Sequence, residues 1–264
     1  MVRYVGRIAP FVLLASFFIG CATVKDAPLV EGPKPNPLLV GVTPDSPPMI
    51  FRLNGEISGA EADMARRLAK ELGRPLEFVD LGWEQEIPAL LEGKTDIIMS
   101  GMTITDARKV RINFTYPYLK SGLVIAMRAG DASKYTSVKS ILDDFPTTGV
   151  IKGTTGEAYV RKNFPPAIRI VAVPNIKDAV LELRQRRIDI IVHDAPAIVW
   201  IVSENEAEIK GLWEPLNEED LGWGVRRDDE EFLDRVNTVL RNWKKDGTLK
   251  EILLKWLPYW KNFD

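Results

Sequence analysis

The chain has 264 residues, of which 45% are hydrophobic and 27% charged, and its 35 Lys and Arg against 37 Asp and Glu residues give a formal net charge of −2. This composition excludes a disordered chain, and a charge near zero excludes the basic surface of a nucleic-acid-binding protein. One Cys, Cys21, and one His, His193, exclude a multi-thiolate or His-rich metal site, so we expect neither metal nor cofactor.

The first 20 residues have the pattern of a secretory signal peptide. Arg3 and Arg7 precede an apolar stretch over 8–20, which is shorter than the ~20 residues that span a bilayer. The stretch ends at Gly20-Cys21, which is similar to a bacterial lipobox, where the Cys is lipidated. We therefore predict a lipoprotein signal peptide over 1–20 and a lipid anchor at Cys21. An ordinary signal peptide or a buried helix that contains a Cys are the alternatives.

The segment after Cys21 has the composition of a linker. Residues 22–37 contain four prolines and no hydrophobic period. A Pro-rich chain is extended and semi-rigid. We therefore expect 21–37 to tether a folded body to a membrane surface, outside the cytoplasm, in the periplasm or on the cell surface.

Strand and helix patterns alternate from residue 38 onward. Ser58 with Glu61 three residues later predicts a capping box that opens a helix, which Gly73 ends, and a second helix is expected over 86–92. Apolar runs predict strands at 38–42, 76–79 and 96–100. This alternation predicts a mostly parallel sheet covered by helices on both faces.

The same pattern returns in the second half of the chain. The segment "ALLEGKTDIIMSG" has a counterpart in "AVLELRQRRIDIIVHD", which predicts two similar α/β lobes. We expect Asn175 to cap a helix between strands, and Asp228 and Thr248 to open two C-terminal helices. The expected strands are 149–151, 171–173 and 188–192.

Three loops after predicted strands carry polar groups suited to a ligand. The first, 100–108, offers Gly101 for close backbone approach and Arg108 for a carboxylate. The second, 153–156, places hydroxyls and N–H groups at a helix N-terminus. The third ends in Asp194, which suits an ammonium. Ligands of open α/β sheets bind at strand carboxyl ends, so these loops predict a zwitterion site divided between two lobes. Each loop alone is also compatible with an ordinary helix cap.

A family resemblance rests on several segments in a fixed order. "IPALLEGKTD" followed by "DIIMSGMTITDARKVRINFTYPYLKSGLVIAMR" resembles the periplasmic amino-acid-binding proteins of ABC importers, the solute-binding family 3. "GVIKGTTGEAYV", "IVHDAPA" and "DGTLKEILLKWL" follow in the expected order, so the resemblance covers nearly all of 38–258.

The resemblance implies an α/β, two-lobed type II periplasmic-binding-protein fold. Each lobe would be a mostly parallel sheet flanked by helices, and the two would close around a ligand about a two-strand hinge. The implied first lobe takes 38–123 plus 220–264, and the second takes 124–219. The hinge strands would lie near 123–128 and 221–225.

The resemblance also implies roles for individual residues. Arg108 would hold the α-carboxylate, Asp194 would take the α-amine, and Trp83 would stack on the ligand side chain. The residues expected to add backbone and hydroxyl hydrogen bonds to the ligand are Ser100, Gly101, Thr103, Thr154 and Thr155.

The segment 43–49 departs from the family pattern, which usually has an aromatic residue there. Ser46 and Met49 are not aromatic, so we expect one wall of the ligand side-chain pocket to be missing or supplied by Phe51. The resemblance therefore predicts an amino acid or an amino-acid-like ligand. The His193-Asp194 pair is similar to that of glutamine-binding members, which favours a polar amino acid.

Two further readings remain open. Cyclohexadienyl dehydratases resemble this family and use an acid near the position of Glu157, which could act as a general acid if burial raised its pKa. The other reading of Glu157 is a favourable charge in the first turn of a helix. We expect a non-catalytic binding protein that serves an ABC importer permease; a sensor for a membrane partner is the other option.

Overall fold

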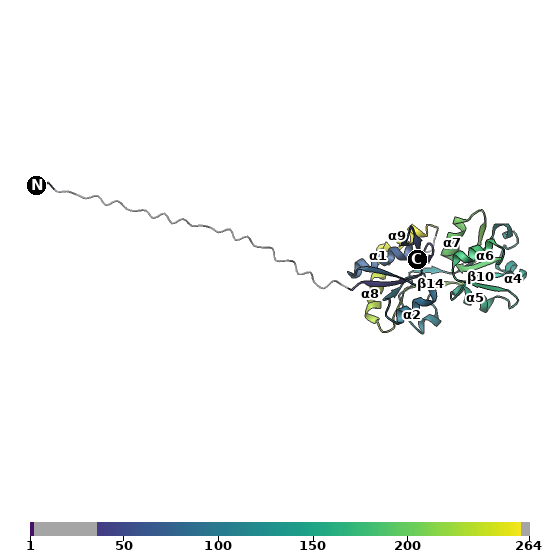
Figure 1. Cartoon of the computed structure of the whole chain (residues 1–264), viewed down its shortest axis with the longest axis horizontal. Helices are drawn as coiled ribbons and strands as arrows, with labels where there is room; N and C mark the ends of the chain where they lie inside the picture. Colours follow the sequence, from purple (N-terminus) through teal and green to yellow (C-terminus); the bar gives the residue numbers. More distant parts are fainter. Residues whose placement is uncertain (3–35, 260–264) are drawn as a thin grey trace. The chain divides into compact units, whose positions relative to one another are not determined.

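The structure is a computed structural model that describes residues 1–2 and 36–259. The signal peptide predicted over 1–20, Cys21 and the tether up to residue 35 lie outside the described residues, as does the segment 260–264. The described residues 36–259 belong to one compact unit, shown in Figure 1. Within the part of the chain that the structure describes, no helix has both the length and the apolarity of a membrane span.

The first lobe is built on a five-stranded sheet in the order β5-β1-β6-β15-β7. Its strands are β1 (Leu38–Val42), β5 (Leu76–Asp80), β6 (Ile97–Ile98), β7 (Asn113–Phe114) and β15 (Gly224–Val225). β1 runs parallel to β5 and β6, whereas β15 runs antiparallel to β6 and β7. The sheet is therefore parallel where the sequence shows strand–helix alternation and antiparallel where a late strand returns to it.

Helices cover both faces of this sheet. On one face, α1 (Ala60–Leu72) packs with the C-terminal helices α8 (Glu230–Asp246) and α9 (Thr248–Trp256), which Figure 1 draws in yellow beside the blue α1. On the other face, Leu90 of α2 (Glu86–Leu91) packs with Ile98 of β6. A small antiparallel sheet adjoins this lobe and consists of β2 (Asp45–Ser46), β3 (Ile50–Leu53) and β4 (Glu56–Ser58).

The second lobe repeats the plan with the strand order β11-β10-β12-β9-β13. Its strands are β9 (Leu123–Arg128), β10 (Thr148–Ile151), β11 (Ile170–Val173), β12 (Ile190–Asp194) and β13 (Ile209–Leu212). β10 is parallel to β11 and β12, and β9 is antiparallel to β12 and β13.

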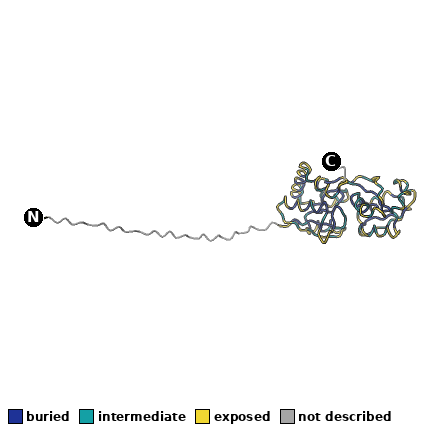
Figure 2. The backbone as a smooth tube through the Cα atoms, turned by 90° about the horizontal axis from the view of Figure 1, so that it is seen from above, coloured by how far each residue is buried: buried dark blue, intermediate teal, exposed yellow. Residues whose placement is uncertain are grey.

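Side chains of the second sheet alternate between two cores. Along β12, Ile190 and Val192 pack under α4 (Val138–Asp144) and α5 (Thr155–Asn163), whereas Ile191 packs on the opposite face. That opposite face is covered by α6 (Ile176–Arg184) and α7 (Ala195–Glu204). In Figure 2 the buried, dark blue stretches of the backbone lie inside the folded unit and the exposed, yellow stretches lie at its periphery. The two-lobed α/β fold implied by the resemblance is confirmed.

A short antiparallel ribbon connects the two lobes. β8 (Leu119–Ser121) pairs with β14 (Glu219–Leu221), and these strands continue into β9 of the second lobe and β15 of the first. The ribbon begins a few residues before each predicted hinge range, and 123–128 is a strand inside the second sheet. Gly122 follows β8, and a Cβ there would lie 2.3 Å from the carbonyl oxygen of Asn217. Only glycine allows the two connecting segments to approach this closely.

The start of α1 differs from the capping box predicted by the sequence. The N-cap is Gly59 and not Ser58, and no side chain caps the helix. Glu61 is instead fully buried and accepts hydrogen bonds from the backbone N–H of Gly101 and from Nε1 of Trp223 at 3.1 Å. A residue expected to cap a helix thus supports the loop that follows β6.

At two other helix starts a polar side chain caps the helix as predicted, although at the second the capping residue lies one position later than predicted. Asn175 caps α6 as expected, and its Oδ1 accepts from the N–H of Asp178 at 2.9 Å. α8 is capped by Asp229 and not by Asp228. Because α6 begins at the cleft edge of β11, its cap also helps to form the cavity described next.

Candidate functional site

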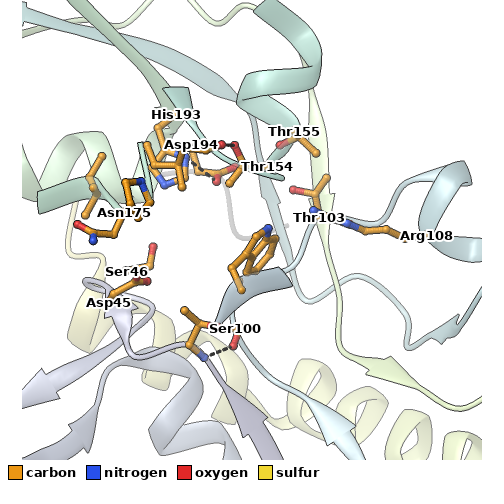
Figure 3. A pocket seen from close by; sticks show the side chains of 16 residues that line it. Asp45, Ser46, Ser100, Thr103, Arg108, Thr154, Thr155, Asn175, His193 and Asp194 are labelled. Atoms are coloured by element: carbon orange, nitrogen blue, oxygen red, sulfur yellow. Dashed lines mark hydrogen bonds and ion pairs between the residues drawn. The ribbon is translucent and has the colours of Figure 1, made fainter. Parts of the chain in front are cut away.

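A cavity lies between the two lobes at the carboxyl ends of their strands. It encloses about 560 Å³ of empty space, its open mouth included. Figure 3 shows Arg108 and Thr103 at one end and Asp45, Ser46 and Asn175 at the other, with His193 and Asp194 above them. The lining residues are Thr43, Asp45, Ser46, Trp83, Ser100, Gly101, Thr103, Arg108, Ile151, Thr154, Thr155, Pro174, Asn175, Ile176, His193 and Asp194.

Nearly all of the ligand-binding residues predicted from the sequence line this cavity. Those that do are Ser46, Trp83, Ser100, Gly101, Thr103, Arg108, Thr154, Thr155 and Asp194. Phe51 is the exception, because its ring packs 5.5 Å from the ring of Trp200 and 5.8 Å from that of Trp256. The cavity wall that the sequence analysis assigned to an aromatic residue is instead polar, with Asp45 and Ser46.

Arg108 is held rigidly at its end of the cavity. Thr105 caps the short helix α3 (Asp106–Lys109) that carries it, and Nη1 of Arg108 donates to the carbonyl oxygen of Thr103 at 2.8 Å. The guanidinium carbon lies 5.1 Å from the ring centroid of Trp83. Burial lowers the pKa of Arg108 from its ordinary value, and the charge of nearby carboxylates, first that of Asp194, opposes this. The guanidinium remains charged and can bind a carboxylate.

Trp83 links the lobes as well as lining the cavity. It lies in the 3₁₀ turn Trp83–Gln85, and its Nε1 donates to the carbonyl oxygen of Gly153 across the cleft at 3.0 Å. Beside it, Lys152 forms a salt bridge with Glu84 at 3.1 Å. Gly153 has φ 75°, and a Cβ there would lie 3.3 Å from the Trp83 ring. The two lobes are therefore in direct contact at Trp83 and Gly153.

Asp194 ends β12 with one oxygen free to take a ligand. It occupies the N-cap position of α7 but makes no capping hydrogen bond, and its Oδ1 is buried without a partner among the described residues. Burial raises the pKa of Asp194 to about 6, although a side-chain hydrogen bond with Glu219 and the charge of Arg108 lower it. An unpaired buried carboxylate oxygen is costly, and an ammonium ligand would relieve that cost.

His193 precedes Asp194 and lines the same wall. Its Nδ1 lies 3.3 Å from Oδ2 of Asp194, and its side chain is 8% exposed. Burial lowers the pKa of His193 to about 4, against the opposing charges of Asp45 and Glu219. The imidazole is therefore neutral at neutral pH and leaves the negative charge of the acids uncompensated.

The floor of the cavity rests on a buried acid that the sequence analysis did not select. Oε1 of Glu86 accepts from the hydroxyl of Thr43 at 2.7 Å and from the hydroxyl of Ser100. Burial raises the pKa of Glu86 to about 8, although hydrogen bonds from Ser100 and Thr43 lower it. Asp45 adds a further acid at the far end, and burial raises its pKa too.

Glu219, in the connecting ribbon, is the other acid that sequence analysis missed. Its Oε2 accepts from the hydroxyl of Thr103 at 2.8 Å and from that of Thr155 at 3.2 Å, so it touches both lobes. Asn217 Nδ2 donates to its Oε1 at 2.9 Å. No local pattern distinguishes Glu219 from its neighbours Glu218 and Asp220, because only the antiparallel pairing of β14 turns its side chain toward the cleft.

Thr154 caps α5 at the second-lobe side of the cavity. Its Oγ1 accepts from the N–H of Glu157 and donates to the carbonyl oxygen of Ile151 at 2.7 Å. The start of α5 thus faces the cavity, with a preference for negative charge. Among the described residues, no group of three or more His, Cys, Asp or Glu side chains is placed to hold a metal ion.

Several proteins that are similar to this chain are described as amino-acid-binding proteins. The ABC transporter arginine-binding protein 1 of Escherichia coli is 26% identical over 253 residues, which cover 93% of this chain and 96% of that protein. The arginine-bound form of truncated ArgBP from T. maritima is 36% identical, with a TM-score of 0.72 over 78% of this chain and 95% of that one.

A third relative bears on the enzyme alternative. The ancestral amino acid-binding protein AncCDT-1, described as a precursor of cyclohexadienyl dehydratase, is 36% identical and superposes with a TM-score of 0.78 over 84% of this chain and 95% of its own.

Residues 38–259 match the family described as bacterial extracellular solute-binding proteins, family 3. With that match over nearly all of the described chain, and with a polar cavity between two α/β lobes, the chain belongs to this family.

Proposed function

We propose that the chain captures a basic amino acid between its lobes and delivers it to the permease of an ABC importer. The observation that carries this proposal is the unpaired, buried Oδ1 of Asp194 in a cavity that also holds Arg108. Arg108 supplies a planar cation for the α-carboxylate, and Asp194 supplies an anion for the α-ammonium. A zwitterion satisfies both at once.

The opposite end of the cavity favours a cationic side chain. Asp45 lies there, away from Arg108 (Figure 3). Its neighbours His193 and Lys177 act on its pKa through charge alone, and His193 is neutral at neutral pH. A guanidinium or ammonium at the end of the ligand side chain would pair with this carboxylate. Arginine binding in the E. coli and T. maritima relatives agrees with this choice.

The N-terminal features belong to the same proposal. Cys21 would carry the lipid anchor after removal of 1–20, and 21–37 would tether the binding unit to the membrane, on the extracytoplasmic side. The first lobe would comprise 38–123 with 220–264, and the second 124–219. Mass spectrometry of the envelope-derived chain tests the anchor: we expect diacylglycerol on Cys21, and an unmodified Cys21 would contradict it.

A dehydratase activity is disfavoured by the surroundings of Glu157. Burial tends to raise its pKa, but the backbone N–H of Gly153 and the side chain of Arg161 outweigh this, so its pKa lies below the ordinary value. Nε and Nη2 of Arg161 donate to Oε1 of Glu157 at 2.9 Å and 2.7 Å. A carboxylate held in this way is a poor general acid. We therefore propose a binding protein without catalytic activity, which is expected to leave prephenate unchanged.

A thermal-shift screen of the full chain against the common amino acids tests the proposed function. Arginine, lysine, ornithine and histidine should raise the Tm most, since a ligand at ~100 times its Kd adds ~2.7 kcal/mol of stability. Isothermal titration calorimetry should give one site per chain. The absence of a shift with every amino acid would overturn the proposed function, and a preference for neutral or acidic amino acids would overturn its basic-ligand part.

A further inference from the structure

Five of the six hydroxyl groups that line the cavity, all but that of Ser46, send their hydrogens away from it. Thr43 and Ser100 donate to Glu86, Thr154 donates to the carbonyl oxygen of Ile151, and Thr103 and Thr155 donate to Glu219. A hydroxyl has a single hydrogen to donate and two lone pairs. Each of these groups can therefore offer only lone pairs to a bound ligand.

Glu219 is the member of this arrangement that acts on both lobes. It is 9% exposed, does not line the cavity, and receives one hydroxyl hydrogen from Thr103 of the first lobe and one from Thr155 of the second. The amide of Asn217 occupies its other oxygen. Burial and then the charge of Asp194 raise the pKa of Glu219, and the three donors oppose this because they stabilise the carboxylate form, which has no hydrogen to give back.

We infer that Glu219 is a positioning residue that fixes Thr103 and Thr155 as hydrogen-bond acceptors for the ammonium group of the ligand. This inference rests on the proposed function. Asp194 lies close enough to Glu219 for each carboxylate to affect the pKa of the other. The two threonine oxygens and Oδ1 of Asp194 then form an acceptor-only site for an ammonium, and Arg108 alone supplies a cation for the carboxylate.

This assignment differs from the role that the family resemblance implies for Thr155. The resemblance implies that Thr155 closes on the α-carboxylate from the second lobe, but here its hydroxyl hydrogen is already committed to Glu219 at 3.2 Å. If Glu219 lost its acceptor oxygens, both threonine hydroxyls would be free to rotate and to donate into the cavity. The site would then discriminate less between an amino acid and its deaminated analogue.

The test compares two substitutions of Glu219 by the ratio of two dissociation constants. Glu219→Gln removes the charge and keeps one acceptor oxygen, whereas Glu219→Met removes both. Calorimetry with L-arginine and with deaminated arginine, which lacks the ammonium, gives the ratio. In Glu219→Met we expect the preference for L-arginine to fall about tenfold, and in Glu219→Gln to fall less, since one hydrogen bond to a charged group is worth about that factor.

Glu218→Gln is the matched control, because Glu218 is the exposed neighbour in sequence. It should leave both dissociation constants unchanged. Equal weakening of both ligands in Glu219→Met, with the ratio preserved, would show a merely structural role and overturn the inference while leaving the proposed function intact. Failure of the wild-type chain to bind any amino acid would overturn both.

Thr155→Val decides the matter if Glu219→Met does not fold. Valine keeps the shape of threonine and lacks the oxygen. If Thr155 accepts from the ammonium, this variant weakens L-arginine and leaves deaminated arginine unchanged. If Thr155 donates to the carboxylate, both ligands weaken alike, which would overturn the inference.

Discussion

The two ends of the cavity are built differently. At one end, Arg108 is fixed by its hydrogen bond to the carbonyl oxygen of Thr103 and by the ring of Trp83. At the other end, Asp45 lies in a two-residue strand, and His193 and Lys177 act on its carboxylate through charge. The rigid end is suited to the carboxylate that every amino acid shares, and the less constrained end is suited to the side chain that differs. General affinity and ligand choice should therefore be separable by mutation.

Arg108→Ala should have the largest effect, because it removes the cation from the rigid end. A charge-assisted hydrogen bond lost in a desolvated cleft leaves the ligand carboxylate unpaired and should cost on the order of 10²-fold or more in affinity. The loss should be similar for every amino acid that binds. Calorimetry measures it, and unchanged affinity would remove Arg108 from the site.

Asp194→Asn should separate the two α-groups. Because the carboxylate is assigned to the ammonium, L-arginine should weaken by about tenfold or more while deaminated arginine keeps its affinity. Titration of both ligands into the variant and the wild type measures this difference. Equal losses for the two ligands would refute the ammonium role of Asp194.

Asp45→Asn should act on ligand choice alone. Removing this charge should weaken arginine and lysine by about tenfold and leave citrulline, a neutral relative of arginine, nearly unchanged. Asp106→Asn is the control, because the Asp106 side chain is fully exposed and lies outside the cavity. If arginine and citrulline weakened to the same extent, Asp45 would belong to the structure of the loop and not to specificity.

The rigid end could be predicted from the sequence and the other end could not. Asp194 ends the apolar strand β12, and Arg108 lies on the short helix α3 that follows the loop after β6, so strand-end geometry brings both to one cleft. The family pattern suggested Phe51 as a substitute for the missing aromatic wall of the cavity, but the turn between β2 and β3 directs its ring to Trp200 and Trp256.

The supporting acids were beyond sequence reasoning for a different reason. Glu86 resembles any charge in the first turn of a helix, and Glu219 resembles any acid in an acidic loop. Glu86 contacts Thr43, 43 residues earlier in the chain, and Glu219 contacts Thr103, 116 residues earlier. A local hydrophobic pattern in the sequence cannot predict contacts over such separations. Only the three-dimensional pairing of distant hydroxyls with these carboxylates identifies them.

Glu86→Gln should give the smallest effect, and it concerns stability. Burial raises the pKa of Glu86 to about 8 from an ordinary value of 4.5, so at intermediate pH the folded state holds a proton that the unfolded chain has released. Stability contributed by that proton is present in full below the ordinary pKa and is lost as the pH rises toward about 8, at up to ~1.4 kcal/mol per pH unit.

Urea unfolding between about pH 5 and about pH 8 should therefore show a shallower decline of the free energy of unfolding in Glu86→Gln than in the wild type. Part of the slope should remain, because burial also raises the pKa of Glu61 to about 7. Parallel curves for the two proteins would mean that Glu86 is already ionised in the unliganded fold, and the floor of the cavity would then carry a negative charge before any ligand arrives.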